Sequence, residues 1–178
     1  MAGLTTERLV LRQWRESDRA PVAALNADPS VMEHFPATLN RAESDALVDR
    51  LGGDIDRRGF GFWALERRSD DAFLGFTGIS VPPYDAPFMP AVEIGWRLAR
   101  DAWGQGYATE AARAALAHGF DEVGLDEIVS FTATVNLRSI AVMERIGMTR
   151  DLDGDFAHPN VAPGHRLERH VLYRVAAS

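Results

Sequence analysis

Apolar and polar residues alternate along the first half of the chain with the period of strands, interrupted by two segments with helical capping signals. Alternation and many β-branched or aromatic residues predict strands at Glu7–Trp14, Phe60–Arg67, Ala72–Ser80 and Ala91–Ala99. Two helices are predicted between the first two strands, one capped by Ser17 and running to Asn26, one running from Asn40 to near Gly52–Gly53. A turn at Asp70–Asp71 predicts an antiparallel pairing.

The period of the apolar residues becomes helical after Gly106, which predicts a helix that ends near Gly119. The remaining elements are a strand at Asp126–Val135, a helix from Asn136 to Gly147, and strands at Met148–Phe156 and Leu167–Val175. A helix that connects neighbouring strands of one sheet makes them parallel. We therefore expect an α+β domain with a mixed, mostly antiparallel sheet.

Composition adds several exclusions to this picture. With 46% apolar residues and no repeat or linker, residues 1–178 are expected to form a single domain. The absence of cysteine excludes disulfides, thiolate metal sites and a cysteine nucleophile. A net charge of −7 argues against nucleic-acid binding and suits a cationic partner such as an amine. No apolar run approaches the roughly 20 residues of a membrane span, so we expect no membrane partner and a cytoplasmic location.

The segment WGQGYATEA, residues 103–111, places two glycines directly before an alanine-rich helix. A strand, a glycine turn and a helix N-terminus gather unpaired N–H groups and the positive end of the helix dipole, which together bind phosphate. The pattern is not a P-loop, which needs Lys and Ser or Thr after its second glycine. Nor is it a dinucleotide fingerprint, which would need a glycine at Thr109. A phosphate loop and a turn that only packs strand against helix both stay open on these residues alone.

The chain resembles the GNAT superfamily of N-acetyltransferases, in the branch of the ribosomal-protein N-terminal acetyltransferases. The resemblance covers nearly the whole chain, through TERLVLRQW, NADPSVM, EIGWRLARDAWGQGYATEA, NLRSIAVMERIGM and HRLERHVLYRV. It implies a GNAT-type central sheet of about seven strands flanked by helices, with a splayed parallel pair at the cofactor site. It also implies acetyl-CoA as the co-substrate and no metal.

The same resemblance implies which residues contact acetyl-CoA. The pyrophosphate would be held by Trp103, Gly104, Gln105, Gly106, Tyr107, Ala108 and Thr109. The pantetheine arm would pair with the strand residues Ile94, Trp96 and Leu98, and its arm or sulfur would be reached by Asn136 and Ser139. Trp103 departs from the family pattern, which has Gln or Arg there, so backbone amides or Arg100 must make that phosphate contact.

Acetyl transfer to an amine needs a base for the surplus proton. Glu93 is the candidate, because it lies on the strand that resembles the family's catalytic one and shares a face with Gly95 and Arg97. The alternative is a solvated Glu93 paired with an arginine. Many relatives have a tyrosine as the acid where this chain has Met143, so we assign the leaving thiolate to Ser139, with water or Tyr107 as alternatives.

The predicted function is an N-acetyltransferase that moves an acetyl group from acetyl-CoA to a primary amine by direct transfer in a ternary complex. A protein N-terminus and a small-molecule amine both fit as the acceptor. Met143 keeps open a non-catalytic module that binds or senses acyl-CoA, and a nucleotide-phosphate binder is a third hypothesis. The acceptor's identity and the oligomeric state, a homodimer included, are left open.

Three further features complete the predictions. DLDGDF, residues 151–156, lacks the glycine and glutamate positions of an EF-hand loop and predicts an Asp-Gly turn between the last two strands. Three histidines lack the spacing of a metal-binding pair and are expected near the acceptor entrance, where one is an alternative base: His158, His165 and His170. By resemblance, segments bordering the acceptor pocket contain Trp14, Phe35 and Tyr84.

Overall fold

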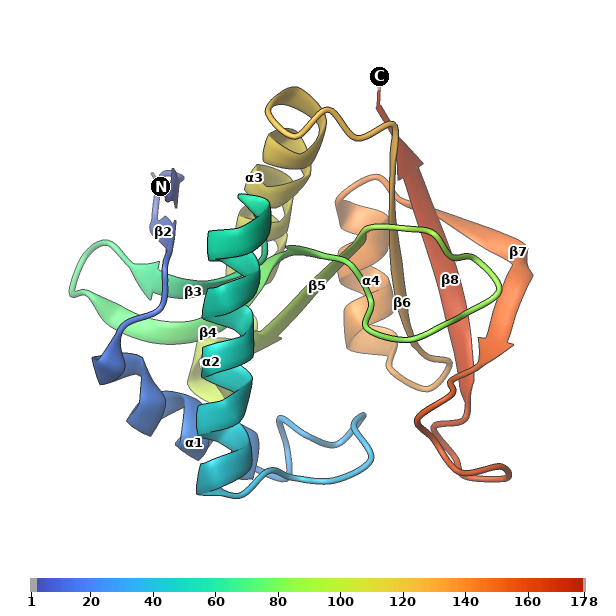
Figure 1. Ribbon diagram of the computed structural model, residues 1–178, viewed down its shortest axis with the longest axis horizontal. Helices are drawn as coiled ribbons and strands as arrows, with labels where there is room; N and C mark the ends of the chain where they lie inside the picture. The colour runs from blue at the N-terminus through green and yellow to red at the C-terminus, as the bar shows by residue number, and fades with distance from the viewer. Residues whose placement is uncertain (1–2, 178) are drawn as a thin grey trace.

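The computed structural model describes residues 3–177, which form one sheet flanked by helices (Figure 1). The strands are β1 (Leu4–Thr5), β2 (Leu9–Arg12), β3 (Phe62–Arg67), β4 (Ala72–Ser80), β5 (Glu93–Leu98), β6 (Glu127–Ala133), β7 (Thr149–Ala157) and β8 (Arg169–Ala176). The helices are α1 (Arg19–Ala27), α2 (Arg41–Arg58), α3 (Tyr107–Asp121) and α4 (Leu137–Arg145). No helix in the described range is long and apolar enough to cross a membrane.

The sheet has the order β1-β2-β3-β4-β5-β6-β8-β7, with helices on both faces. In Figure 1, α1 and α2 lie in front of the sheet, and α3 and α4 lie behind it. Close packing of α3 depends on small residues: Ala111, Ala112 and Ala115 are fully buried. A Cβ at Gly119 would lie 2.7 Å from Cδ1 of Ile128, so α3 approaches the sheet more closely than a larger residue allows.

The strands β5 and β6 form the only parallel pair of the described sheet, and they meet at one residue pair, Glu93 and Val129. The Val129 N–H donates to Val92 O at 2.9 Å, and Ser130 Oγ donates to Ile94 O at 2.9 Å. Beyond these contacts the two strands diverge (Figure 1). The prediction of a mixed, mostly antiparallel sheet with a splayed parallel pair is therefore confirmed, with eight strands because the short β1 adds to β2.

The predicted end of α2 at Gly52–Gly53 is wrong, because the helix continues to Arg58. Its buried residues Val48, Leu51 and Ile55 keep helical spacing across both glycines, so packing against the sheet outweighs their low helix propensity. The helix instead ends at Gly59, whose φ of 85° is the left-handed conformation that glycine adopts without strain.

One predicted helix start is confirmed and the other is wrong. Asn40 Oδ1 accepts from the Glu43 N–H at 3.0 Å, and the Asn40 N–H donates to Glu43 Oε2 at 2.8 Å, a complete capping box. Ser17 caps nothing, because it lies inside a short 3-10 turn, Glu16–Asp18. Asp18 is the residue before α1, but its carboxylate accepts from the Arg15 N–H at 2.7 Å and makes no capping bond to the helix.

The segment DLDGDF is not a turn between the last strands, as predicted, but lies within β7. Its register against β8 shifts between Asp151 and Phe156, so the extra residues form a bulge. Arg174 of β8 donates to Asp151 Oδ2 at 2.8 Å and holds the strands together there. Residues 158–168 make the actual connection to β8.

Candidate active site

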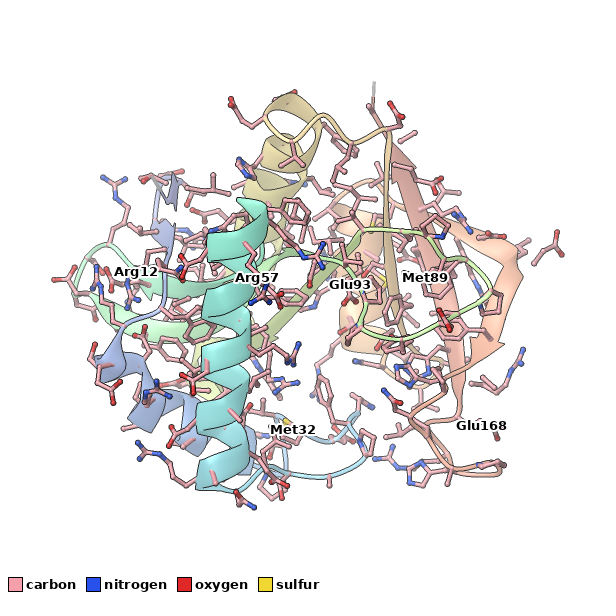
Figure 2. The ribbon with its side chains drawn as sticks, viewed as in Figure 1. Arg12, Met32, Arg57, Met89, Glu93 and Glu168 are labelled. Carbon is pink, nitrogen blue, oxygen red and sulfur yellow. The ribbon has the colours of Figure 1, made fainter. Side chains whose placement is uncertain are left out.

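A cavity of about 930 Å³ is lined by residues from both diverging strands, the glycine loop and α4. Figure 2 shows Glu93 near the centre of the molecule, where β5 begins between α2 and the β6–β8 half of the sheet. The predicted residues that line the cavity are Glu93, Ile94, Trp96, Leu98, Trp103, Gly104, Gly106, Tyr107, Ala108, Thr109, Asn136 and Ser139. Gln105 is outside it, because its side chain turns back and donates to Asp101 O at 2.8 Å.

The glycine loop presents a row of free amides to this cavity. Gly104 and Gly106 have φ values of 74° and 81°, which turn the chain sharply before α3. Within residues 3–177, none of the N–H groups of residues 104–109 has a hydrogen-bond acceptor, and the first that does is Glu110, bonded to Gly106 O at 3.0 Å. These amides and the α3 dipole form a site for an anion.

Two residues before β2 hold the loop from its outer side. Arg8 donates to Gln105 O at 3.0 Å and forms an ion pair of 2.6 Å with Glu110. Thr6 Oγ1 also donates to Glu110 at 2.6 Å. Burial alone would raise the pKa of Glu110, but the bonds from Thr6 and Arg8 lower it. The ionised Glu110 therefore anchors the loop and leaves its inner amides free.

Trp103 contributes packing rather than a phosphate contact. Its Nε1 donates to Leu98 O at 2.9 Å, and its ring packs against the core. The guanidinium of Arg138 lies 4.4 Å from the Trp103 ring, and that of Arg100 lies at 5.7 Å. These two arginines bring positive charge to the loop where Trp103 has none. Arg138 was not predicted, because its place beside the loop depends on how α4 packs.

The backbone of β5 is open on the side of β6. Val92 and Ile94 direct their carbonyls to β6, so strand alternation directs those of Trp96 and Leu98 the same way. Leu98 O is already bonded to Trp103 and Ile94 O to Ser130. Trp96 therefore keeps both its N–H and its carbonyl facing the diverging part of the cavity, where an extended ligand can pair with them.

Glu93 has no ion pair with any described residue, so the alternative of a solvated Glu93 paired with an arginine does not hold. Burial in the cavity raises its pKa to about 8, and the positive charge of Arg50 offsets only part of that rise. A carboxyl with a pKa near neutral pH can take up and release a proton under ordinary conditions.

Two of the three predicted histidines line the same cavity as Glu93. His158 and His170 line the cavity with their rings 4.7 Å apart, and His158 Nε2 lies 3.0 Å from the hydroxyl of Tyr84. Burial lowers the pKa of His158 and lowers that of His170 to about 4, so both imidazoles are neutral at pH 7. His165 is exposed and outside the cavity.

Of the three aromatic residues expected at the acceptor side, two line the cavity and one does not. Phe35 and Tyr84 line the cavity, as the resemblance implies. Trp14 does not, because its Nε1 donates to Phe62 O at 2.8 Å and its ring packs against Phe73 and Phe76.

Asn136 and Ser139 are hydrogen-bonded to each other where α4 lines the cavity. Asn136 Oδ1 accepts from the Ser139 N–H at 3.3 Å, which confirms the predicted cap, and Asn136 Nδ2 donates to Ser139 Oγ at 3.1 Å. Because its oxygen accepts this bond, the Ser139 hydroxyl is oriented to donate its own proton elsewhere. Met143 is buried in the same wall and offers no proton.

Comparisons with known proteins agree with this arrangement. Residues 8–149 match the family model of the acetyltransferase (GNAT) domain. The protein YkkB of Bacillus subtilis is 34% identical over 82% of this chain and 84% of its own. The FsC-acetyl coenzyme A-N(2)-transacetylase of Aspergillus fumigatus is 31% identical over 82% of this chain and 64% of its own.

Solved structures show the same fold over the full length. A GNAT-family acetyltransferase from Bacillus anthracis superposes with a TM-score of 0.79 at 25% identity, covering 98% of each chain. The ribosomal alpha-N-protein acetyltransferase RimL, in complex with coenzyme A, superposes with a TM-score of 0.75 at 19% identity, covering 96% of this chain and 95% of its own. RimL is thus a neighbour in fold, and the branch within the superfamily is not settled by it. The chain belongs to the GNAT family and is an N-acetyltransferase that uses acetyl-CoA.

Proposed function

We propose that the chain acetylates a primary amine by direct transfer, with acetyl-CoA and the amine bound together in the cavity described above. One observation carries the proposal: the free amides of residues 104–109 and the unpaired carboxyl of Glu93 open into the same cavity from opposite ends of β5. An anion site and a titratable group in one space are what a transfer between acetyl-CoA and an amine requires.

The residues present fit acetyl-CoA, which supplies the acetyl thioester. The amides of residues 104–109 would hold its pyrophosphate, with Arg100 and Arg138 nearby as cations. The open backbone of Trp96 would pair with the pantetheine amides, and the splay between β5 and β6 leaves room for that arm. These assignments bring together residues from three separate segments of the chain.

Glu93 is the base in this proposal. The amine nitrogen bonds to the thioester carbon, the carbon–sulfur bond breaks, and the surplus amine proton passes to Glu93 directly or through water. The sulfur leaves with the bonding electron pair and takes up a proton. A raised pKa suits Glu93 to this task, because proton transfer is most effective when the base titrates near the working pH.

Ser139 stabilises the leaving sulfur by donating a hydrogen bond. Its hydroxyl is held by Asn136 and lines, from α4, the cavity that Glu93 also lines. Met143, at the position of the acid in many relatives, cannot contribute a proton. Serine is a much weaker acid than a thiol, so Ser139 favours the thiolate by hydrogen bonding rather than by full protonation.

The test separates binding from turnover. Calorimetric titration with acetyl-CoA, with ATP as the control ligand, should show one-to-one binding of acetyl-CoA alone. A panel of amines that includes peptides with free N-termini, amino acids and polyamines should then release CoA thiol with at least one member. Preference for ATP, or saturable acetyl-CoA binding without thiol release with any amine, would contradict the proposal.

A further inference from the structure

We call the part of the cavity lined by Phe35, Tyr84 and Glu93 its acceptor half. Two arginines there have no carboxylate partner among the described residues. Arg97, on β5, and Arg50, on α2, both line the cavity together with Glu93. Neither forms an ion pair, although eleven other arginines of the described chain do. Arg50 is exposed, but Arg97 is half-buried, and half-buried cations are ordinarily paired, so the unpaired Arg97 guanidinium beside an open space calls for a ligand.

Arg97 is held firmly in place while most of its donors stay free. Its Nη1 donates to Asn26 Oδ1 at 2.7 Å, and the fully buried Asn26 is itself bonded to Ser44. Its guanidinium lies 4.1 Å from the ring centre of Phe35 and 5.1 Å from that of Phe76. A guanidinium has five N–H donors. Within the described chain, Asn26 accepts from Nη1 only, and Nε is buried without an acceptor.

Arg12 shows how the same protein treats a buried guanidinium that serves structure. Its donors reach Asp18 at 2.8 and 2.9 Å and Glu66 at 2.7 Å, so two carboxylates neutralise it. Figure 2 places Arg12 on the far side of α2 from Glu93, away from the cavity. Burial alone would lower the pKa of Arg12, yet the bonds to Asp18 and Glu66 raise it. For Arg97, burial and the charge of Arg50 lower the pKa to about 10, the response of a cation without its anion.

The remaining groups around the cavity do not supply that anion. The pKa of Glu93 lies at about 8, so its carboxyl is mostly neutral at pH 7. His158 and His170 are neutral there as well, because burial lowers their pKa values. The acceptor half therefore carries positive charge from Arg50 and Arg97, which repels a polycationic amine and attracts an anionic group.

The strand also fixes where such a group would lie relative to the reacting amine. Glu93 and Arg97 share a face of β5 and are about 13 Å apart along the strand. Gly95 lies between them without a side chain, so nothing from β5 blocks the path. A Cβ there would come within 3.1 Å of Phe62. The Phe62 ring therefore covers Gly95, and an acceptor that spans from Glu93 to Arg97 passes along this ring, because all three side chains line the cavity.

We propose that the acceptor is an amine that also carries a carboxylate, which Arg97 and Arg50 bind while the amine lies beside Glu93. The inference rests on the proposed acetyl transfer and narrows it to amino acids, short peptides and related amino carboxylates. Arg97 would act as a preformed bidentate donor, because Asn26 and the two phenylalanines fix its orientation before the acceptor binds.

The test compares each acceptor with its neutral twin. Amino acids, ω-amino acids and dipeptides are assayed by CoA thiol release beside the same compounds with a carboxamide in place of the carboxylate, with rates corrected for the fraction of neutral amine. We expect kcat/KM to be at least about tenfold higher for the preferred carboxylates. Aminoalkylphosphonates and spermidine complete the panel as anionic and cationic alternatives.

The variants Arg97→Gln and Arg50→Gln should remove this preference by slowing only the carboxylate compounds, whereas a purely structural role would slow both twins equally. Arg68→Gln is the matched control, because Arg68 is exposed, lies outside the cavity and bonds only to backbone oxygens. Calorimetry with acetyl-CoA verifies that each variant is folded, and Arg97→Lys should restore part of the preference.

Each outcome of these assays either supports or overturns the carboxylate inference. Equal rates for both twins, or a preference for the carboxamides, the phosphonates or spermidine, would overturn the carboxylate inference and leave acetyl transfer standing. Failure of every amine to release CoA thiol would instead overturn the proposed function and the inference with it.

Discussion

At the scale of single residues, the site is defined by groups whose usual partners are missing. Glu93 lacks a cation, Arg97 lacks an anion, and Trp96 and the amides of residues 104–109 lack acceptors or donors. Arg12 and Glu110, which lie outside the cavity, are by contrast fully paired. Groups left unpaired at one place are where a ligand completes the structure.

Replacing Glu93 by Gln should remove the base while keeping nearly the same shape. We expect kcat/KM to fall by about 10²–10⁴-fold, the usual contribution of a positioned general base, while the affinity for acetyl-CoA changes by less than about twofold. Glu127→Gln is the control, because Glu127 is an exposed glutamate on the neighbouring strand β6. Unchanged kcat/KM in Glu93→Gln would exclude Glu93 as the base.

The rate should follow the ionisation of Glu93. Only the ionised carboxylate accepts a proton, so kcat/KM should rise with pH and level off above about 8, the raised pKa. Of the groups around it, burial and Glu93 raise the pKa of Tyr84, and His158 and His170 lose their protons at lower pH because burial lowers their pKa values. The measurement needs an acceptor whose amine pKa lies well below 8. A profile that is already level at pH 6 would contradict this assignment.

At the scale of elements, the glycine loop and the diverging strand β5 form most of the candidate site. The loop forms where η2, the 3-10 turn Arg100–Ala102, passes into α3, and two positive φ angles keep its amides facing the cavity. The splay arises because β5 and β6 share a single residue pair before they diverge. One element thus supplies the anion site and the other the extended edge beside it.

Gly104→Ala and Gly124→Ala form a matched pair that tests the loop. Their φ values are 74° and 76°, and a Cβ at either would have no atom within 4 Å, so both alanines should cost about 1 kcal/mol of backbone strain. Only Gly104 lines the cavity. We expect Gly104→Ala to weaken acetyl-CoA binding about tenfold and Gly124→Ala to leave it unchanged, by calorimetry. Equal affinities would remove the loop from the cofactor site.

The sequence predicts elements well where the signal is local and poorly where packing decides. The capping box at Asn40 and the cap at Asn136 involve residues three apart, and both are present. Gly52–Gly53 and DLDGDF carry local signals for chain ends and turns, but the buried stripe of α2 and the pairing of β7 with β8 outweigh them. No sequence pattern identifies Arg50 as a residue of the site, because only the tertiary fold brings it to a cavity shared with Arg97.

At the scale of the whole molecule, charge and stability are distributed unevenly. The chain has a net charge of −7, which suits a cationic partner, yet the acceptor half of its cavity is positive through Arg50 and Arg97. Local charge at the site, rather than the total, decides which acceptor binds. The half-buried Glu93 without an ion-pair partner also weakens the fold whenever Glu93 is ionised.

The loss of stability on ionisation of Glu93 predicts that a variant without this carboxyl is more stable and less active. The pKa of Glu93 is higher in the folded protein than in the unfolded chain, so its ionisation destabilises the fold as pH rises from about 4.5 to about 8. Glu93→Gln should therefore raise Tm at pH 8.5 by about 5 °C or more and change it little at pH 5. An equal shift at both pH values would show that burial of an ionised Glu93 is not the cause.

The central claim is that acetyl-CoA and an amine react in the cavity between β5 and β6, and one measurement tests it most directly. Purified protein is incubated with acetyl-CoA and the amine panel, and CoA thiol release is followed together with the mass of each amine. We expect steady thiol release matched by the gain of one acetyl group on a single class of amine. Acetyl-CoA that binds tightly while no amine gains an acetyl group would contradict it.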